Sequence, residues 1–484
     1  MATQAFMRTY AHPEEEAAQA QFAAQATSYA TRWAYYTNEA FNDLARWQAY
    51  RGKHRLYRNH RSLYNPTRRL VDFYAGAIYP GVVTADAGRY GNGARLAYPL
   101  AESTSPAIRS ALDVLWQWSN WQTQKGVLAR WAGALGDVLI EVSDDLEREK
   151  VTPALVWPAH VADLTLDATG NVKAYRIEYK AMDARGQSYT YAKAVDGDWF
   201  RTFRDNQPAQ EWRNEYGFAP AVWLKHADVG GLHGQPALRS VEKVDELNGL
   251  VSQAHDNLRK MMGAPLIVAT QGTLSPLNAG EKRGGTAEAK ELNRDEAELL
   301  NIWQVQGDAN ILTVPLDPQA ALVWADKLLA EIEHDHPELT FYQQLRGMGE
   351  VSGVAASRLM GDVEGLVLDA QSAYDTQATK LFQMCLAIGG WRVNTKAWGR
   401  TGQGLTRAQE VFRPFGLDSY ARGDLDFTIL PRPLVPLSER ELIEVERERL
   451  ALDGERQEQQ APAVAAGVSE RLRAATVTVP GRAA

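Results

Sequence analysis

The sequence contains almost no cysteine. Cys385 is the only one among 484 residues, and it lies in an apolar stretch that runs from 381 to 388. A single cysteine cannot form a disulfide within the chain, and it cannot build a cysteine-rich metal site. Cys385 is therefore predicted to be a small buried apolar residue, in a protein made in a reducing compartment.

Long apolar runs are also lacking. No window reaches the ~18 uninterrupted apolar residues that a membrane span needs, and residues 1–13 carry no apolar signal-peptide core. Hydrophobic residues make up 45% of the chain and charged residues 23%, which is ordinary for a packed protein. The sequence predicts a soluble globular protein without a membrane partner.

Motifs of catalysis are missing as well. A nucleotide-driven motor needs a glycine loop that ends in lysine, and the nearest match, 280–286, has glycine at that position. The chain has no Gly-x-Ser-x-Gly elbow and no His-Glu-x-x-His pair. His334 and His336 are interpreted as the polar entrance of a loop, and Asp144 and Asp145 as a solvated turn. We expect no enzyme activity, no metal and no cofactor.

Acidic residues outnumber basic ones. The formal net charge is −8 and the pI is near 5.7. Proteins that grip the phosphates of DNA usually have basic surfaces. The charge balance argues against tight binding of a DNA duplex. It does not argue against a protein that lets DNA pass without holding it.

About the first 130 residues are predicted to be mostly helical, because apolar and aromatic residues recur there at helical spacing, as they do from Glu14 to Arg51. Two later helices start at Asn65 and Ser105, which are favoured capping residues and are each followed by proline. A further helix is predicted from Gln122 to Leu135, before Gly136.

An alternating pattern then replaces the helical one. Turn sequences rich in Asp, Asn and Gly separate short β-type segments, up to a group of glycines at 230–234. This pattern predicts an antiparallel β region with strands at 137–142, 154–157, 164–166, 172–179, 187–195, 199–204 and 221–224.

The clearest helix is predicted at 237–262. Its apolar residues alternate three and four apart, which is the spacing of a packing seam, although an ordinary core helix has the same pattern. The seam residues are Val244, Leu247, Val251, Ala254, Leu258 and Met261.

A polar excursion follows this helix. Strands are predicted at 265–270, 301–306 and 311–314, around a charged stretch at 272–300. A second helix starts near Asp317, and a glycine-broken segment leads to a long helix from Ser352 to Trp391, with bends expected at Gly361 and Gly365. A final strand is predicted at 425–430.

This order of elements resembles the portal proteins of tailed bacteriophages, especially those of long-tailed phages. The resemblance includes the segment 65–72 with Tyr79, and the residues Val-Ser-Gly-Val-Ala-Ala-Ser-Arg at 351–358 before the long helix. It covers roughly residues 60–450 and implies a predominantly helical α+β chain of ring-forming, portal-type architecture. The implied regions are a wing (1–236), a stem helix (237–262), a clip (263–316), a second stem helix (317–333), a tunnel loop (334–351), a wing return with a long kinked helix (352–430) and a crown with the C-terminal tail (431–484).

The resemblance also implies which residues would act. The seam residues of the 237–262 helix would pack between neighbouring subunits. The tunnel loop would face DNA through Gln343, Gln344, Arg346, Met348 and Glu350, although a flexible helix connector is an alternative interpretation of this segment. The clip would meet partner proteins through Glu281, Lys282, Arg283, Glu288 and Lys290.

The implied function is a ring, usually of twelve subunits, at one capsid vertex, through which double-stranded DNA is packaged and ejected without sequence specificity. Its partners would be other copies of the chain, the terminase motor, the head–tail adaptor, and the major capsid and scaffolding proteins. It would assemble in the cytoplasm of the host bacterium and reside in the virion. Two alternatives stay open: another head–tail connector or minor capsid protein, and an enzyme subunit of DNA packaging, which the missing phosphate loop disfavours.

Overall fold

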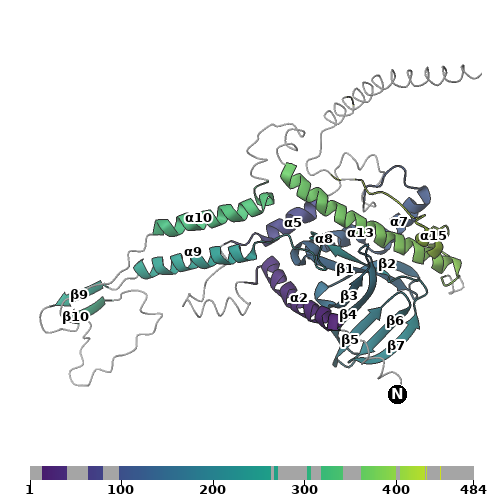
Figure 1. Cartoon of the computed structure of the whole chain (residues 1–484), viewed down its shortest axis with the longest axis horizontal. Coiled ribbons are helices and arrows are strands. Elements are labelled where there is room, and N and C mark those ends of the chain that lie inside the picture. Colours follow the sequence, from purple (N-terminus) through teal and green to yellow (C-terminus); the bar gives the residue numbers. More distant parts are fainter. Residues whose placement is uncertain are drawn as a thin grey trace, which may run out of the picture. The chain divides into compact units, whose positions relative to one another are not determined.

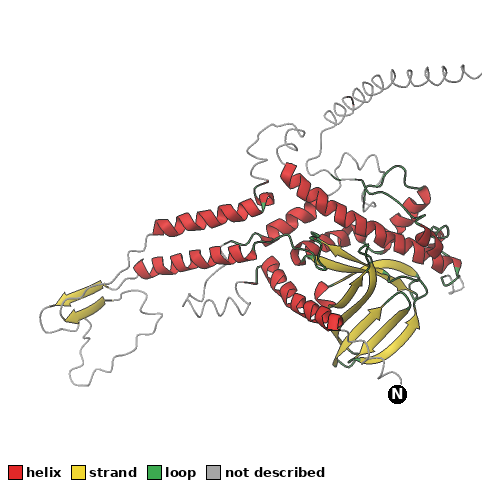
Figure 2. Ribbon diagram, in the orientation of Figure 1, coloured by secondary structure: helices red, strands yellow, loops and turns green. Residues whose placement is uncertain are grey.

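The computed structural model describes residues 13–40, 64–79, 98–262, 266–270, 302–306, 318–341, 361–398 and 404–430, together with Arg432 and Arg447. The fold is mixed, 49% helical and 23% strand, with two antiparallel sheets (Figure 2). The chain divides into two compact units, one within 1–340 and 369–430 and the other within 341–368 and 431–484. The elements below belong to the first unit, except for the first residues of the long helix α13.

Helices open the described part of the chain. They are α2 (Pro13–Thr37), α5 (Thr67–Ile78), α7 (Pro106–Trp118) and α8 (Trp121–Leu135). Helix α2 ends at Thr37, and Asn38 follows it with a left-handed φ of 65°; the part of the predicted helical stretch from 41 to 51 lies outside the described residues. Asparagine tolerates this conformation, and here its Oδ1 accepts a hydrogen bond from Asn65 Nδ2 at 3.0 Å.

The helix start predicted at Ser105 is confirmed, whereas α5 begins at Thr67, one residue later than predicted, with Pro66 in the capping position. The Ser105 Oγ accepts a hydrogen bond from the Ile108 N–H at 3.2 Å, and Pro106 occupies the first turn. The Asn65 Oδ1 accepts from the Thr67 N–H at 3.2 Å and from its hydroxyl at 2.7 Å. Short-range capping chemistry therefore determines where these helices begin.

Helix α8 leads through Gly136, with a φ of 108°, into the first sheet, whose order is β2-β1-β8. The second sheet has the order β3-β4-β5-β6-β7 and is antiparallel throughout. The strands are β1 (Asp137–Asp145), β2 (Lys150–Val156), β3 (Val161–Leu166), β4 (Val172–Met182), β5 (Ser188–Val195), β6 (Trp199–Arg204), β7 (Gln207–Arg213) and β8 (Ala221–Lys225).

All seven predicted strands of this region are present, and β7 is an additional one. Every residue of β7 is exposed. A strand without a buried face has no need of alternating apolar residues, and this alternation is the pattern by which strands are predicted. Residues of both sheets share one core, which includes Leu139, Tyr175, Ile177, Phe200 and Trp223. This shared core joins the two sheets.

A second core forms around the long helix α13 (Gly361–Asn394). The ring of Phe382 contacts Trp116 and Trp121, at centroid distances of 6.0 Å and 5.2 Å. Cys385 is fully buried, as predicted. A Cβ at Gly390 would lie 2.2 Å from the carbonyl oxygen of Phe415, so the segment after α13 approaches the helix closely only because this residue is glycine.

Two short helices, α14 (Arg407–Glu410) and α15 (Leu417–Arg422), follow α13. The strand predicted at 425–430 is wrong. This segment forms a single bridge, between Ile429 and Leu100, flanked by hydrogen bonds of 2.9 and 2.8 Å to residues 99–101. Its apolar residues are buried in an irregular conformation rather than in a sheet.

Helices α9 (Val241–Met262) and α10 (Pro318–Asp335) pack side by side (Figure 1). Helix α9 begins at Val241, somewhat after the predicted start at 237. Strands β9 (Leu266–Thr270) and β10 (Ile302–Gln306) pair in parallel, so two of the three strands predicted in the excursion are confirmed. The third, at 311–314, lies outside the described residues. None of the described helices is long and apolar enough to cross a membrane.

Candidate functional site

The residues predicted to act fall into two groups. The five tunnel-loop residues and the five clip residues named from the sequence lie outside the described residues. The seam residues lie in α9, where Val244 and Leu247 are buried within the single chain and Val251 and Ala254 are half-buried. Leu258 and Met261 also belong to α9, but their side chains lie outside the described set. Packing of the seam against a neighbouring subunit stays a prediction.

One face of α9 is hydrogen-bonded to Tyr64 and to Tyr35 of α2. The amide of Asn248 pairs with the backbone of Tyr64, accepting from its N–H at 3.0 Å and donating to its carbonyl at 2.7 Å. The hydroxyl of Tyr35 donates to Asp245. Asn248 is fully buried, so its paired amide compensates a desolvation that would otherwise be costly. This contact was not predicted from the sequence; its only signal there is that Asn248, a polar residue, follows the seam residue Leu247.

A second face of α9 packs on α10. Ala325 and Ile332 are buried apolar residues of α10. The ammonium group of Lys243 reaches across to Asp335 at 2.7 Å and to Glu331 at 3.6 Å. The two helices are therefore joined by apolar contacts and by an ion-pair network at one end.

Three large apolar side chains of α10 are exposed, among charged residues that include Asp326 and Lys327. Leu322, Val323 and Trp324 are consecutive and are 60%, 54% and 60% exposed. The Lys327 ammonium lies 5.0 Å from the centre of the Trp324 ring, which places a positive charge beside the apolar residues. Three large exposed apolar side chains in a row are unusual for a surface that only water contacts.

The base of the helix pair is a buried polar corner. The chain leaves α10 through His336 and enters the turn η2 (Pro337–Leu339). His336 lies where the helix passes into this turn, and it is fully buried, with its Nε2 2.9 Å from Ser240 Oγ. His334 is exposed in the last turn of α10. Glu338 is also buried, and its Oε1 accepts a hydrogen bond from the Tyr74 hydroxyl of α5.

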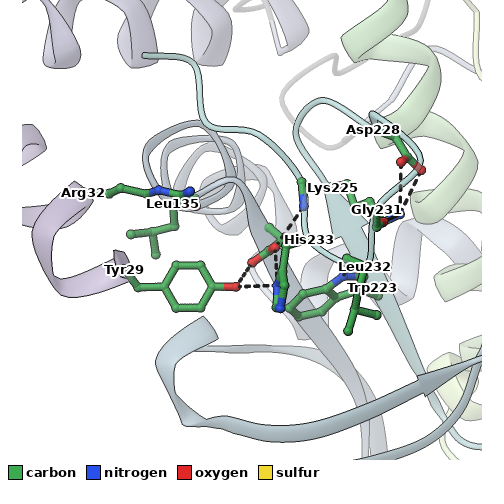
Figure 3. Close-up of polar contacts among 11 residues, drawn as sticks. Tyr29, Arg32, Leu135, Trp223, Lys225, Asp228, Gly231, Leu232 and His233 are labelled. Carbon is green, nitrogen blue, oxygen red and sulfur yellow. Dashed lines mark hydrogen bonds and ion pairs between the residues drawn. The ribbon is translucent and has the colours of Figure 1, made fainter. Parts of the chain in front are cut away.

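Another buried carboxylate, that of Asp137, lies where α8 meets β1. Figure 3 labels Tyr29 and His233, two of the residues beside it. The Tyr29 hydroxyl donates to one oxygen of Asp137, while His233 Nδ1 and the Gly234 N–H lie 3.1 Å from the other. Burial, with Asp137 adding to the effect, raises the pKa of Tyr29 well above its usual value. Asp137 is fully buried and hydrogen-bonded at both oxygens, so we interpret this cluster as a joint that holds α2 against the glycine-rich segment before α9.

Asp144 and Asp145 separate in the structure. The side chain of Asp144 is only 8% exposed and accepts from Arg392 Nε at 2.7 Å and from the Tyr216 hydroxyl at 2.5 Å, so the solvated-turn interpretation is wrong for it. Asp145 does form the turn, accepting from the N–H groups of Glu147 and Arg148 at 3.0 and 2.9 Å. Strand β1 extends to Asp145, and successive side chains of a strand point to opposite faces.

Within the described ranges, no group of three or more His, Cys, Asp or Glu residues is arranged to hold a metal ion. Neither the models of known protein families nor the curated proteins match this sequence. The candidate site is therefore defined by its own geometry: the α9/α10 pair, the exposed apolar residues of α10 and the buried corner at the end of α10.

Proposed function

We propose that this chain is a portal-type subunit, which assembles with copies of itself into a ring around double-stranded DNA at a capsid vertex. The proposal is supported by the order of elements: a helix pair that flanks an excursion with strands β9 and β10, and a long helix α13 after it. That is the order by which the sequence resembles phage portal proteins.

The observation that carries the proposal is the run of three exposed apolar side chains on α10, Leu322, Val323 and Trp324. Burying a large apolar side chain contributes ~1.5–3 kcal/mol, so covering three of them strongly favours association. A ring joins unlike faces of identical subunits, so the occupant of this face would be α9 of the next copy.

The charges beside the two faces support this occupant. Glu242 and Glu246 are exposed on α9, four residues apart and so on one stripe of the helix. They would meet Lys327, which lies beside Trp324 on α10 of the neighbouring copy. Opposite charges at the rim of an interface set its register and its choice of partner.

The acidic balance of the chain fits the same function. The formal net charge of −8 is repeated in each subunit of a ring. A basic channel would hold the phosphates through counterion release, whereas an acidic one would let the duplex slide. We therefore propose a passive conduit that docks a terminase motor and later a head–tail adaptor, without catalysis of its own.

Assembly of the full chain tests the proposal. Electron micrographs of the purified protein at several salt concentrations should show rings with a central hole. Trp324→Glu should shift the protein to monomers, because it places a charge in the centre of the proposed interface. Leu146→Glu is the matched control, because Leu146 is 55% exposed in the β1–β2 turn and should leave rings intact.

A charge exchange identifies the occupant. Lys327→Glu and Glu246→Lys should each weaken the rings, and the double variant should restore them. If the double variant does not restore assembly, α9 of a neighbour is not the occupant. If the wild-type chain stays monomeric at high concentration in every salt condition, the portal proposal is overturned.

The ring images also separate the alternatives. Another head–tail connector or a minor capsid protein would lack a stem-shaped profile formed by paired helices. A DNA-packaging enzyme subunit would hydrolyse ATP or cut DNA, and an assay of the purified chain would detect either activity.

A further inference from the structure

The polar corner between α10 and η2 contains two buried groups that the proposed ring does not use. Their surroundings come from three places: α5 provides Tyr74, the segment before α9 provides Arg239 and Ser240, and α10 itself provides Asp335. Ser240 Oγ lies 2.9 Å from His336 Nε2, and Arg239 Nη2 lies 4.0 Å from Glu338 Oε1.

Each group has one polar atom that the corner leaves without a hydrogen bond. Both His336 Nδ1 and Glu338 Oε2 are buried and have no partner among the described residues. The corner thus encloses an imidazole that forms a hydrogen bond through Nε2 only, which suits the neutral form. A protonated imidazole would need an acceptor at both nitrogens.

The charges that face His336 oppose one another. Glu338 and Asp335 favour its protonated form, whereas Arg239 and Lys243 disfavour it. The ring of Tyr74 is in edge contact with a second buried histidine, His226, at a centroid distance of 4.8 Å. Burial is the largest of these effects and lowers the pKa of His336 below its usual value.

We propose that His336 is an acid-sensitive latch: the neutral side chain closes the corner between α10, η2 and α5, and protonation opens it. The latch does not depend on ring formation, because every group in it belongs to one chain. Opening would free His336 from Ser240 and η2 from Tyr74, at the point where the chain leaves the helix pair.

The direction of the pH dependence follows from the sign of the shift. The unfolded chain takes up a proton on His336 as the pH falls below the ordinary value of about 6.5, whereas the closed corner resists it. The stabilisation is therefore complete above that pH and is lost progressively as the pH falls through it.

Hydrogen exchange of the full chain tests the latch. After correction for intrinsic exchange rates, the backbone amides of 335–340 should exchange faster by about tenfold or more at about pH 5 than at about pH 7.5. His336→Gln keeps a hydrogen-bonding group toward Ser240 but cannot titrate in this range, so it should remove the difference. His334→Gln is the control, because His334 is exposed two residues away, and it should keep the difference.

Two results would overturn the latch. One is an unchanged pH difference in His336→Gln. The other is slower exchange at acid pH in the wild type, which would mean that Glu338 captures the new proton donor and tightens the corner.

Should His336→Gln fail to fold, Glu338→Gln decides the matter. This variant keeps an oxygen that can accept from Tyr74, and it removes a charge that favours protonation of His336. The onset of faster exchange should move to lower pH, and an unmoved onset would overturn the proposal.

Discussion

The sheet region and the α9/α10 pair differ in how completely the chain itself buries their apolar side chains. In the sheets, residues from both sheets cover each other, and Leu139, Tyr175 and Trp223 are almost completely buried. In α10, the inner residues Ala325 and Ile332 are buried, while three large apolar residues face outward. Two helices cannot enclose a core by themselves, so an apolar outer face remains unless another surface covers it.

We therefore expect the loss of a tryptophan to have different effects in the two regions. In the folded body, Trp121 is packed by the chain itself. On α10, a tryptophan would be packed only by a partner.

Trp121→Ala should destabilise the chain by ~3–5 kcal/mol, because it leaves a cavity where the fully buried Trp121 packs against Phe382. The measurement is the urea concentration at the midpoint of unfolding. A loss below ~1 kcal/mol would show that the core around α13 is not the stable part of the molecule.

Acid should weaken the body through His226. Burial lowers the pKa of this residue to about 4, and its Nδ1 lies 3.0 Å from the Tyr374 hydroxyl. The stabilisation is complete above the unfolded pKa of about 6.5 and is lost as the pH falls toward 4, by up to about 3 kcal/mol. Unfolding of the wild type and of His226→Gln should therefore differ in pH slope between these values. Equal slopes would contradict the prediction.

Trp324→Ala should change the stability of the monomer by no more than ~0.5 kcal/mol, because the side chain is mostly exposed and leaves no cavity. The same variant should weaken assembly, measured by analytical ultracentrifugation. A large loss of monomer stability would mean that this face is covered within the chain, and the contrast between the two regions would disappear.

Much of the local structure could be predicted from the sequence, because its causes are local. Ser105 and Asn65 accept hydrogen bonds at the starts of their helices from groups only two or three residues away, and alternating side chains identify strands β1 to β6 and β8. The strand β7 escaped prediction because its pattern carries no apolar face. Asp144 was misjudged because its partner Arg392 lies 248 residues further along the chain.

The features of the candidate site also differ in whether their causes are local in the sequence. The sequence alone determined the spacing of the α9 seam, the start of a helix near Asp317 and the absence of the catalytic motifs sought. Only the tertiary structure decided which faces of these helices are covered, because burial depends on segments that meet after folding. It placed Val244 and Leu247 inside the chain, left Trp324 in water, and enclosed His336 and Glu338 in one corner with Tyr74 of a distant helix.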